Sequence, residues 1–251
     1  MTATLDAGLR RELVRLARED ALLAFDFDGT LAALVDDPQA AALAEPTRML
    51  LSALAAHRRC AVLSGRALDD LRARLAGLPL VALVGNHGLE VDGVPPPEAL
   101  RHRVHAWGRE LQGRLEGEPG VRVEDKGLSL SVHFRGAPAP GRAEATIRAA
   151  ADALPGARVF GGHAVVNCVP EGAPDKGAAL RGLLVAAQAP AALYVGDDQT
   201  DESAFALAGE FPLLSVRVGP EAGTRAQYVL ADRSAVDALL HALLEGVAQG
   251  S

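Results

Sequence analysis

The stretch ALLAFDFDGTL, residues 21–31, decides the fold class of this chain. Its apolar run, residues 21–27, predicts a short buried β-strand that ends in two aspartates. Gly29 then permits a tight turn that alanine or valine would resist. In open α/β sheets, ligands bind beyond the carboxyl ends of the strands, so Asp26 and Asp28 mark the expected position of a site. Taken alone, the stretch also fits two solvated aspartates in an ordinary turn.

Composition limits the class of protein. The chain has 251 residues, 49% of them hydrophobic, which is enough for one large domain or two unequal ones. A net charge of -7 disfavours nucleic acid or an anionic membrane as partner, because both require a basic face. Cys60 and Cys168 lie in apolar runs, as expected of packed thiols in a reducing compartment. No signal-peptide pattern and no membrane-spanning run is found, so a cytoplasmic location is expected.

Three more buried strands are predicted, and polar residues follow each of them. The strands cover residues 60–63, 80–84 and 192–195. The polar groups that follow are Ser64-Gly65-Arg66, Gly85-Asn86-His87-Gly88 and Gly196-Asp197-Asp198. A serine at a strand end beside a helix start is well placed to bind phosphate, although an N-cap or a turn explains any one group alone. The repetition favours a shared site.

Charged residues near the end of the chain point to ions. Asp197, Asp198, Asp201 and Glu202 are four acids within six residues, and their repulsion predicts a bound cation. A helix capping box would explain only one or two of them. Lys176 opens a predicted helix at the end where cations are disfavoured, and a bound anion would explain it.

Of the 25 basic residues, only Lys126 and Lys176 are lysines. Lysine is a compact point charge, whereas arginine is a planar fork, so the two residues are not interchangeable at phosphate and sugar sites. We therefore expect a functional role for both lysines, although two chance survivors of a bias toward arginine remain the simpler alternative.

The middle of the chain has a different pattern. Helices are expected at residues 98–115 and 142–154, and strands at residues 121–124, 128–134, 158–160 and 164–169, with a Gly161-Gly162 hairpin turn between the last two. Strand 128–134 alternates apolar and polar residues, as in a half-buried antiparallel sheet. Proline and glycine at the junctions, residues 95–97 and 170–174, predict opening and closing of this unit over the site.

The predicted fold is therefore α/β. A Rossmann-like core with a parallel sheet is formed by residues 1–96 and 171–251, and a smaller α+β cap domain is inserted at residues 97–170.

The residues at the strand ends match the requirements of phosphoryl transfer. Asp26 is assigned as the nucleophile that forms an aspartyl-phosphate, and Asp28 as the group that protonates the leaving oxygen and then activates water. Mg²⁺ is the expected cofactor. Its predicted ligands are Asp26, Asp28 through its carbonyl, Asp197, Asp198 and Asp201. The predicted phosphate-binding residues are Ser64, Gly65 and Lys176.

Four segments in this order resemble the haloacid dehalogenase superfamily, and the chain as a whole resembles its trehalose-phosphate phosphatases. The motifs that carry the narrower resemblance are Ser64-Gly65-Arg66, Gly85-Asn86-His87-Gly88 with Glu90, Lys126-Gly127, His133-Phe134-Arg135, and Gly196-Asp197-Asp198 with Thr200-Asp201-Glu202. The resemblance implies trehalose 6-phosphate as the substrate. The implied substrate contacts are Arg66, Asn86, His87, Glu90, Lys126, His133, Arg135 and Asn167.

The last predicted cap strand departs from the family pattern. The family has Gly-Lys, a Glu that bonds sugar hydroxyls, and a basic residue before Pro, whereas this chain has Gly162-His163, Asn167 and Val169 before Pro170. The alternatives are therefore a phosphatase of sucrose phosphate or a glycosyl-phosphoglycerate, a sugar phosphomutase, or a silent regulatory domain. The intact set of candidate catalytic residues disfavours the last. The chain is expected to act as a monomer on a small sugar phosphate.

Overall fold

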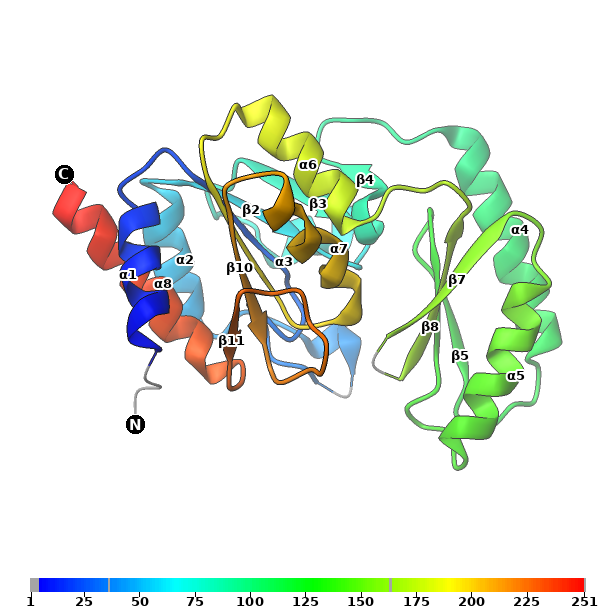
Figure 1. The fold of residues 1–251 in the computed structure, drawn as a ribbon. Helices are drawn as coiled ribbons and strands as arrows, with labels where there is room; N and C mark the ends of the chain where they lie inside the picture. Colours follow the sequence, from blue (N-terminus) through cyan, green and yellow to red (C-terminus); the bar gives the residue numbers. More distant parts are fainter. Residues whose placement is uncertain (1–4, 36, 163, 251) are drawn as a thin grey trace.

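The computed structural model describes residues 5–35, 37–162 and 164–250, which form two sheets (Figure 1). The larger sheet has seven strands. In spatial order they are β11 (Tyr228–Leu230), β10 (Leu213–Val218), β9 (Ala192–Gly196), β1 (Leu22–Phe25), β2 (Arg59–Leu63), β3 (Ala82–Gly85) and β4 (Glu90–Val91). The smaller sheet has four strands. They are β5 (Arg122–Asp125), β6 (Leu130–His133), β8 (Val165–Pro170) and β7 (Ala157–Gly162).

β1 lies in the middle of the larger sheet, in parallel register with β2 and β9. Because parallel strands end on the same edge, Asp26, Ser64 and Asp197 come from neighbouring strand ends. The predicted α/β fold with a parallel sheet is confirmed, apart from β4, a two-residue edge strand antiparallel to β3. Two residues are too few for a hydrophobic alternation, so β4 leaves no pattern in the sequence.

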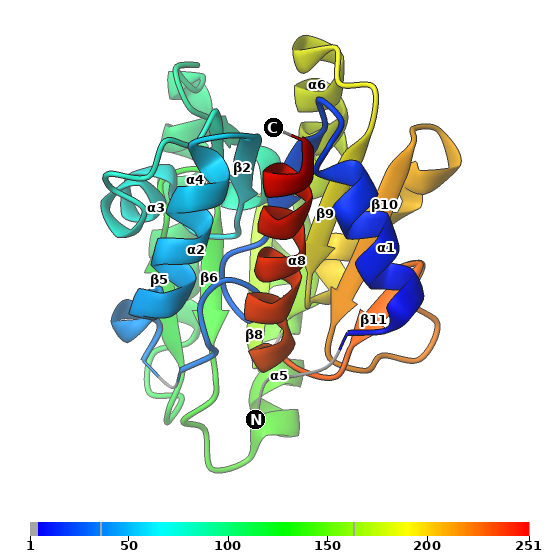
Figure 2. The same ribbon diagram turned by 90° about the vertical axis from the view of Figure 1, so that its left-hand side faces the viewer.

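The side chains of β1 alternate between two buried layers. Leu23 and Phe25 pack with residues of α1 (Ala7–Leu16), α2 (Glu45–Ala55), α3 (Leu68–Arg74) and α8 (Ser234–Gly250). Leu22 and Ala24 pack on the other face with α6 (Lys176–Ala187) and α7 (Glu202–Phe205). Figure 2 shows α8 between α1 and α2. Burying one Leu or Phe side chain is worth about 1.5–3 kcal/mol, so these layers hold the strand ends rigidly in place.

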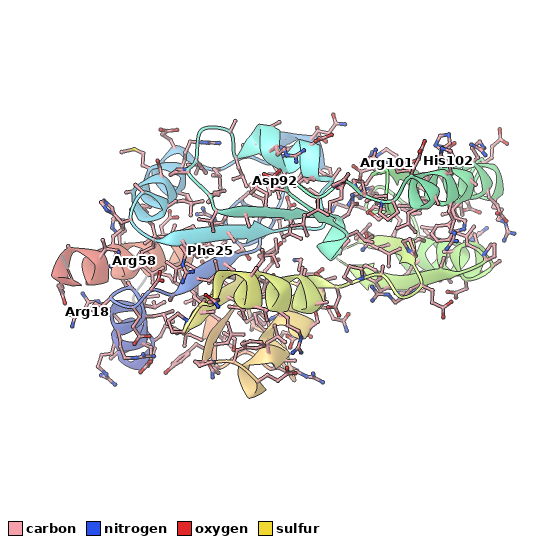
Figure 3. All side chains as sticks on the ribbon, turned by 90° about the horizontal axis from the view of Figure 1, so that it is seen from above. Arg18, Phe25, Arg58, Asp92, Arg101 and His102 are labelled. Atoms are coloured by element: carbon pink, nitrogen blue, oxygen red, sulfur yellow. The ribbon has the colours of Figure 1, made fainter. Side chains whose placement is uncertain are left out.

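The smaller sheet is antiparallel and covered on one face only. α4 (Glu98–Arg114) and α5 (Pro140–Asp152) pack on that face through Trp107 and Ile147. Arg101 and His102 lie on the solvent side of α4, whereas Phe25 lies inside the larger unit (Figure 3). The opposite face of the sheet carries polar side chains and is turned toward the ends of the core strands (Figure 1).

The hairpin between β7 and β8 differs from the predicted one. β7 runs through Gly161 and Gly162, so the prediction of a turn at these glycines is wrong. A Cβ at Gly161 would lie 2.7 Å from the Arg148 side chain, and one at Gly162 would lie 2.9 Å from Val165. These glycines permit close packing of neighbouring groups, a role that sequence alone does not distinguish from a turn. His163 lies outside the described residues.

The division into a core (residues 1–96 and 171–251) and a cap (residues 97–170) stays our interpretation, and we use both words in this sense. Within the described part of the chain, no helix combines the length and apolarity that a bilayer crossing requires.

Candidate active site

A cavity of about 230 Å³ lies between the strand ends of the core and the polar face of the cap sheet. Most of the residues predicted from the sequence line it. They are Asp26, Asp28, Gly65, Arg66, His87, Lys126, His133, Arg135, Asn167, Lys176, Asp197 and Asp198. Four predicted residues do not line it: Ser64, Asn86, Glu90 and Asp201.

Lys176 is buried between two carboxylates. Its Nζ donates to Oδ1 of Asp26 at 2.8 Å and to Oδ1 of Asp201 at 2.8 Å. Burial lowers the pKa of this ammonium, but the charges of Asp201 and Asp26 outweigh burial and hold its pKa above the usual value. Asp175 caps α6 by accepting from the Ala178 N–H at 2.8 Å. Two carboxylates therefore explain a lysine at this helix start, and no bound anion is needed.

Both carboxylate oxygens of Asp201 are engaged in hydrogen bonds within the protein. Its Oδ1 also accepts from the Tyr194 hydroxyl at 2.6 Å, and its Oδ2 accepts from the N–H groups of Asp197 at 3.1 Å and Asp198 at 2.9 Å. Asp198 and Asp201 form a capping box at η3 (Gln199–Asp201). Of the four acids that suggested a cation, Asp201 is thus neutralised by Lys176, and Glu202 pairs with Arg217 at 3.2 Å.

Asp26, Asp197 and Asp201 form an acidic cluster in which one oxygen from each lies within 4.8 Å of the others. Burial raises the pKa of Asp26 well above its usual value, despite Lys176. Burial and the charge of Asp201 raise the pKa of Asp197 to about 7. Three carboxyl groups therefore share one ammonium, and a divalent cation would favour their ionised forms.

Gly29 allows this cluster to form. Its φ of 79° is unfavourable for other residues, and a Cβ at this position would lie 2.0 Å from Oδ2 of Asp197. The turn after β1 can therefore approach the turn after β9 only with glycine at position 29.

Asp28 is held by Arg66. The guanidinium donates from Nε to Oδ2 and from Nη2 to Oδ1, both at 2.7 Å. Arg66 also donates to Asp70 at 2.8 Å and to the carbonyl of Pro38 at 2.7 Å. The bidentate contact between Arg66 and Asp28 fixes the orientation of the Asp28 carboxylate.

The cap wall is the side of the cavity that the cap sheet forms. It is built from residues that face one another across neighbouring strands. Glu124 on β5 is directly opposite Ser131 on β6, which is opposite Asn167 on β8. The Ser131 hydroxyl donates to Oδ1 of Asn167 at 2.7 Å, so the NH₂ group of Asn167 is the part left for a ligand. His133 Nε2 lies 2.6 Å from Oε2 of Glu124, and this hydrogen bond lowers the pKa of Glu124 to about 2.

Sequence reasoning missed Glu124, which places a carboxylate in the cavity wall. The available signal was the alternation of Val121 and Val123 with Arg122 and Glu124, which puts Glu124 on one face of its strand. The pairing of that face with Asn167 is a long-range contact that no local pattern reveals.

The side chains of Ser64, Asn86 and Glu90 do not line the cavity and bond to neighbouring groups instead. The Ser64 hydroxyl accepts from the Arg66 N–H at 3.2 Å. Asn86 and Glu90 bond each other and neighbouring backbone groups. These contacts suit residues that shape the wall.

Comparison with known proteins gives a consistent family. A family model described as trehalose-phosphatase matches residues 24–234. The "Trehalose-phosphate phosphatase" of Mycobacterium ulcerans is 38% identical over 202 residues, 74% of this chain and 50% of that protein. The protein of the same name from Mycobacterium tuberculosis is 38% identical over 219 residues, 80% of this chain and 54% of that protein. The chain thus spans about half the length of these relatives.

Solved structures share the fold. The C-terminal domain of trehalose-6-phosphate phosphatase from C. albicans matches with a TM-score of 0.79 at 22% identity, covering 97% of this chain and 98% of that one. A trehalose-6-phosphate phosphatase from Aspergillus fumigatus matches with a TM-score of 0.63 at 26% identity, covering 97% and 98%. Because the family model covers most of the sequence, the chain belongs to the trehalose-phosphatase family.

Proposed function

We propose that this protein is a Mg²⁺-dependent phosphatase that hydrolyses trehalose 6-phosphate to trehalose and phosphate. One observation carries the proposal: Asp26, paired with Lys176, and Asp28 line the same cavity as the polar face of the cap sheet. A reacting phosphate would meet Asp26, Asp28 and Lys176, which we call the core wall. The sugar attached to it would meet the cap wall. Family membership supports the same substrate.

The donor set of the acidic cluster fits a hard divalent cation. Asp26 and Asp197 offer carboxylate oxygens, and the carbonyl of Asp28 lies in the same turn. We propose that these three groups hold Mg²⁺ and that Asp201, whose oxygens are already engaged, instead positions Lys176. The cation would offset charge on the phosphoryl oxygens. Asp198 lines the cavity beside them and remains a further candidate ligand.

The chain's own residues account for the two chemical steps. In the first, a carboxylate oxygen of Asp26 bonds to phosphorus and the bond from phosphorus to the sugar oxygen breaks. Asp28, protonated at an oxygen that Arg66 has released, gives the leaving oxygen its proton. In the second, Asp28 takes a proton from a water molecule that attacks the aspartyl-phosphate, which releases phosphate and restores Asp26. Lys176 keeps Asp26 oriented in both steps.

The cap wall would bind the sugar. Lys126, His133, Arg135 and Asn167 line the cavity as the predicted contacts, and Glu124 joins them. We propose that Glu124 supplies a carboxylate acceptor for sugar hydroxyls, since the chain has Asn167 where the family has Glu. Asn167 also favours a second candidate, a phosphatase of the same design that acts on another sugar phosphate.

We further propose that the enzyme acts as a monomer in the cytoplasm. Cys60 and Cys168 are buried and free, as is usual in a reducing compartment.

Phosphate release from a panel of sugar phosphates tests these proposals. The panel includes trehalose 6-phosphate and sucrose phosphate, each with Mg²⁺ and with a chelator. We expect fastest release from trehalose 6-phosphate, lost with the chelator. A preference for another sugar would retain the mechanism and reject the substrate. Transfer of the phosphoryl group without phosphate release would indicate a mutase, and no Mg²⁺-dependent turnover of any substrate would reject the phosphatase.

A further inference from the structure

Asn86 is buried, and its backbone lies in the left-handed region that few residues other than glycine adopt. Its φ is 48°, and His87 follows with a φ of 59°, so two consecutive residues other than glycine are left-handed. Such a backbone persists only where its surroundings impose it. Here the Asn86 N–H donates to the Arg66 carbonyl at 2.7 Å, and the His87 N–H donates to the Ser64 carbonyl at 3.0 Å. The segment is therefore pinned to the loop of residues 64–66.

The side chain of Asn86 is directed to the cap. Its Nδ2 donates to the Lys126 carbonyl at 3.1 Å, and its Oδ1 accepts from the Ser129 hydroxyl. The same Nδ2 donates to Oε2 of Glu90 at 2.5 Å. Both N–H donors of the amide are thus used within the protein, and Asn86 does not line the cavity.

Glu90 carries the connection into the core. Its Oε2 accepts from the N–H of Leu68, the first residue of α3, at 2.8 Å. α3 in turn carries Asp70, which holds Arg66. Lys126 adds a second connection, because its Nζ donates to the Gly65 carbonyl at 2.9 Å. The cap turn is thus bonded to the loop of residues 64–66 directly through Lys126 and indirectly through Asn86.

We propose that Asn86 is a positioning residue. It couples the position of the cap to the position of the loop of residues 64–66. It fixes the cap turn at Lys126 and Ser129 against this loop, and so sets both the position of the cap wall and the Arg66 contact with Asp28. This role goes beyond sugar contact, which the sequence resemblance implied for Asn86 and Glu90. It rests on the proposed phosphatase activity only for its kinetic test.

Two variants test the proposal, Asn86→Asp and Ser129→Ala. Asn86→Asp removes both donors and sets a carboxylate against Glu90, which can impair folding. Ser129→Ala removes one of the two bonds between Asn86 and the cap and leaves the bond to the Lys126 carbonyl. Ser131→Ala is the matched control, because this serine one position along the same cap face bonds Asn167 and not the core.

Hydrogen exchange at the amides of Asn86, His87 and Leu68 is the first readout. We expect exchange to be about tenfold faster in Ser129→Ala, as for loss of one buried hydrogen bond, and unchanged in Ser131→Ala. This readout needs no substrate and so stands even where the proposed function fails. Exchange at the wild-type rate in both Ser129→Ala and Asn86→Asp would overturn the proposal.

Kinetics with trehalose 6-phosphate and with p-nitrophenyl phosphate, which has no sugar, is the second readout. We expect kcat/KM to fall by a similar factor, about tenfold, for both substrates in Ser129→Ala, because the loop of residues 64–66, which holds Asp28 through Arg66, is loosened. A rise in KM for the sugar phosphate alone, with p-nitrophenyl phosphate unaffected, would instead make Asn86 and its partner a sugar contact.

Discussion

Asp201 on the core side of the cavity accepts four hydrogen bonds, whereas Glu124 on the cap side is held by the imidazole of His133. Lys176 on the core side is fully enclosed between two carboxylates, while the Glu124 side chain is 35% exposed. The groups around Asp26 are thus held by more bonds than Glu124. Changes in the core wall should remove activity altogether, and changes in the cap wall should alter only which sugar is accepted.

The largest effect should come from the nucleophile. Asp26→Asn keeps the shape of the side chain but removes the charge that attacks phosphorus, so kcat should fall by about 10⁴-fold or more. The loss should be equal for trehalose 6-phosphate and p-nitrophenyl phosphate, because the core wall treats all phosphates alike. Steady-state phosphate release measures both. Residual activity within tenfold of the wild type would remove Asp26 from this role.

Lys176→Met should destabilise the fold strongly. It leaves Asp26 and Asp201 buried without their shared cation, and removal of one partner of a buried ion pair typically costs about 3–5 kcal/mol. Urea unfolding monitored by circular dichroism gives the free energy of unfolding. The control is Arg10→Met, which breaks an exposed pair with Glu245 and should cost less than about 1 kcal/mol. Equal losses in the two variants would mean that the buried ion pairs of Lys176 stabilise the fold no more than an exposed pair does.

Glu124→Gln should act on the sugar alone. It removes a charged acceptor from the cap wall, so kcat/KM for trehalose 6-phosphate should fall by about 10- to 100-fold while p-nitrophenyl phosphate is unaffected. Asn167→Glu adds a carboxylate two positions along the same cross-strand row and should restore part of the loss in the double variant. If both substrates declined together in Glu124→Gln, the residue would belong to the catalytic wall.

The smallest expected effect is on the pH dependence of stability, and it comes from His87. This residue lies between the core wall and the cap wall. Its ring contacts Phe160 of the cap edge-to-face, and neither ring nitrogen has a hydrogen-bond partner among the described residues. Burial, aided by the charges of Lys126 and Lys176, lowers the pKa of its imidazole well below the usual value. Below about pH 6.5 only the unfolded chain takes up the proton, so the free energy of unfolding should fall by up to about 1.4 kcal/mol per pH unit.

His87→Gln keeps a polar side chain that does not titrate. Between pH 6.5 and 5 its free energy of unfolding should therefore depend less on pH than that of the wild type, while the two proteins should run parallel above pH 7. Chemical denaturation at several pH values measures the difference. Curves that stay parallel throughout would mean that His87 is protonated in the folded protein.

Sequence patterns predicted the strands of the core better than they predicted the contacts between its side chains. The prediction of strands at residues 60–63 and 192–195 agrees with β2 and β9. Both segments carry a local signal, an unbroken run of apolar residues. The polar groups after the core strands were found for the same reason, since an apolar run ends where they begin.

Contacts between distant residues were not predictable in this way. Lys176 suggested a missing anion, because its two carboxylates come from positions 150 and 25 residues away along the chain. Glu124 went unnoticed because its importance depends on the pairing of three strands. The predicted site residues that line the cavity remain proposals about function, and the four that do not line it show how a motif can combine contact residues with supporting ones.

The scarcity of lysine in this chain has a practical consequence. Lys126 lies at the boundary between the two walls, on the Gly65 carbonyl, whereas Lys176 lies inside the core between Asp26 and Asp201. A protease that cuts only after lysine therefore has two targets in this sequence, and of these Lys126 is the one that separation of the walls would expose. Cleavage at Lys126 requires the cap turn to leave the loop, so the digestion rate would report how often the cavity opens. A bound ligand that closes the walls should protect the chain from being cut.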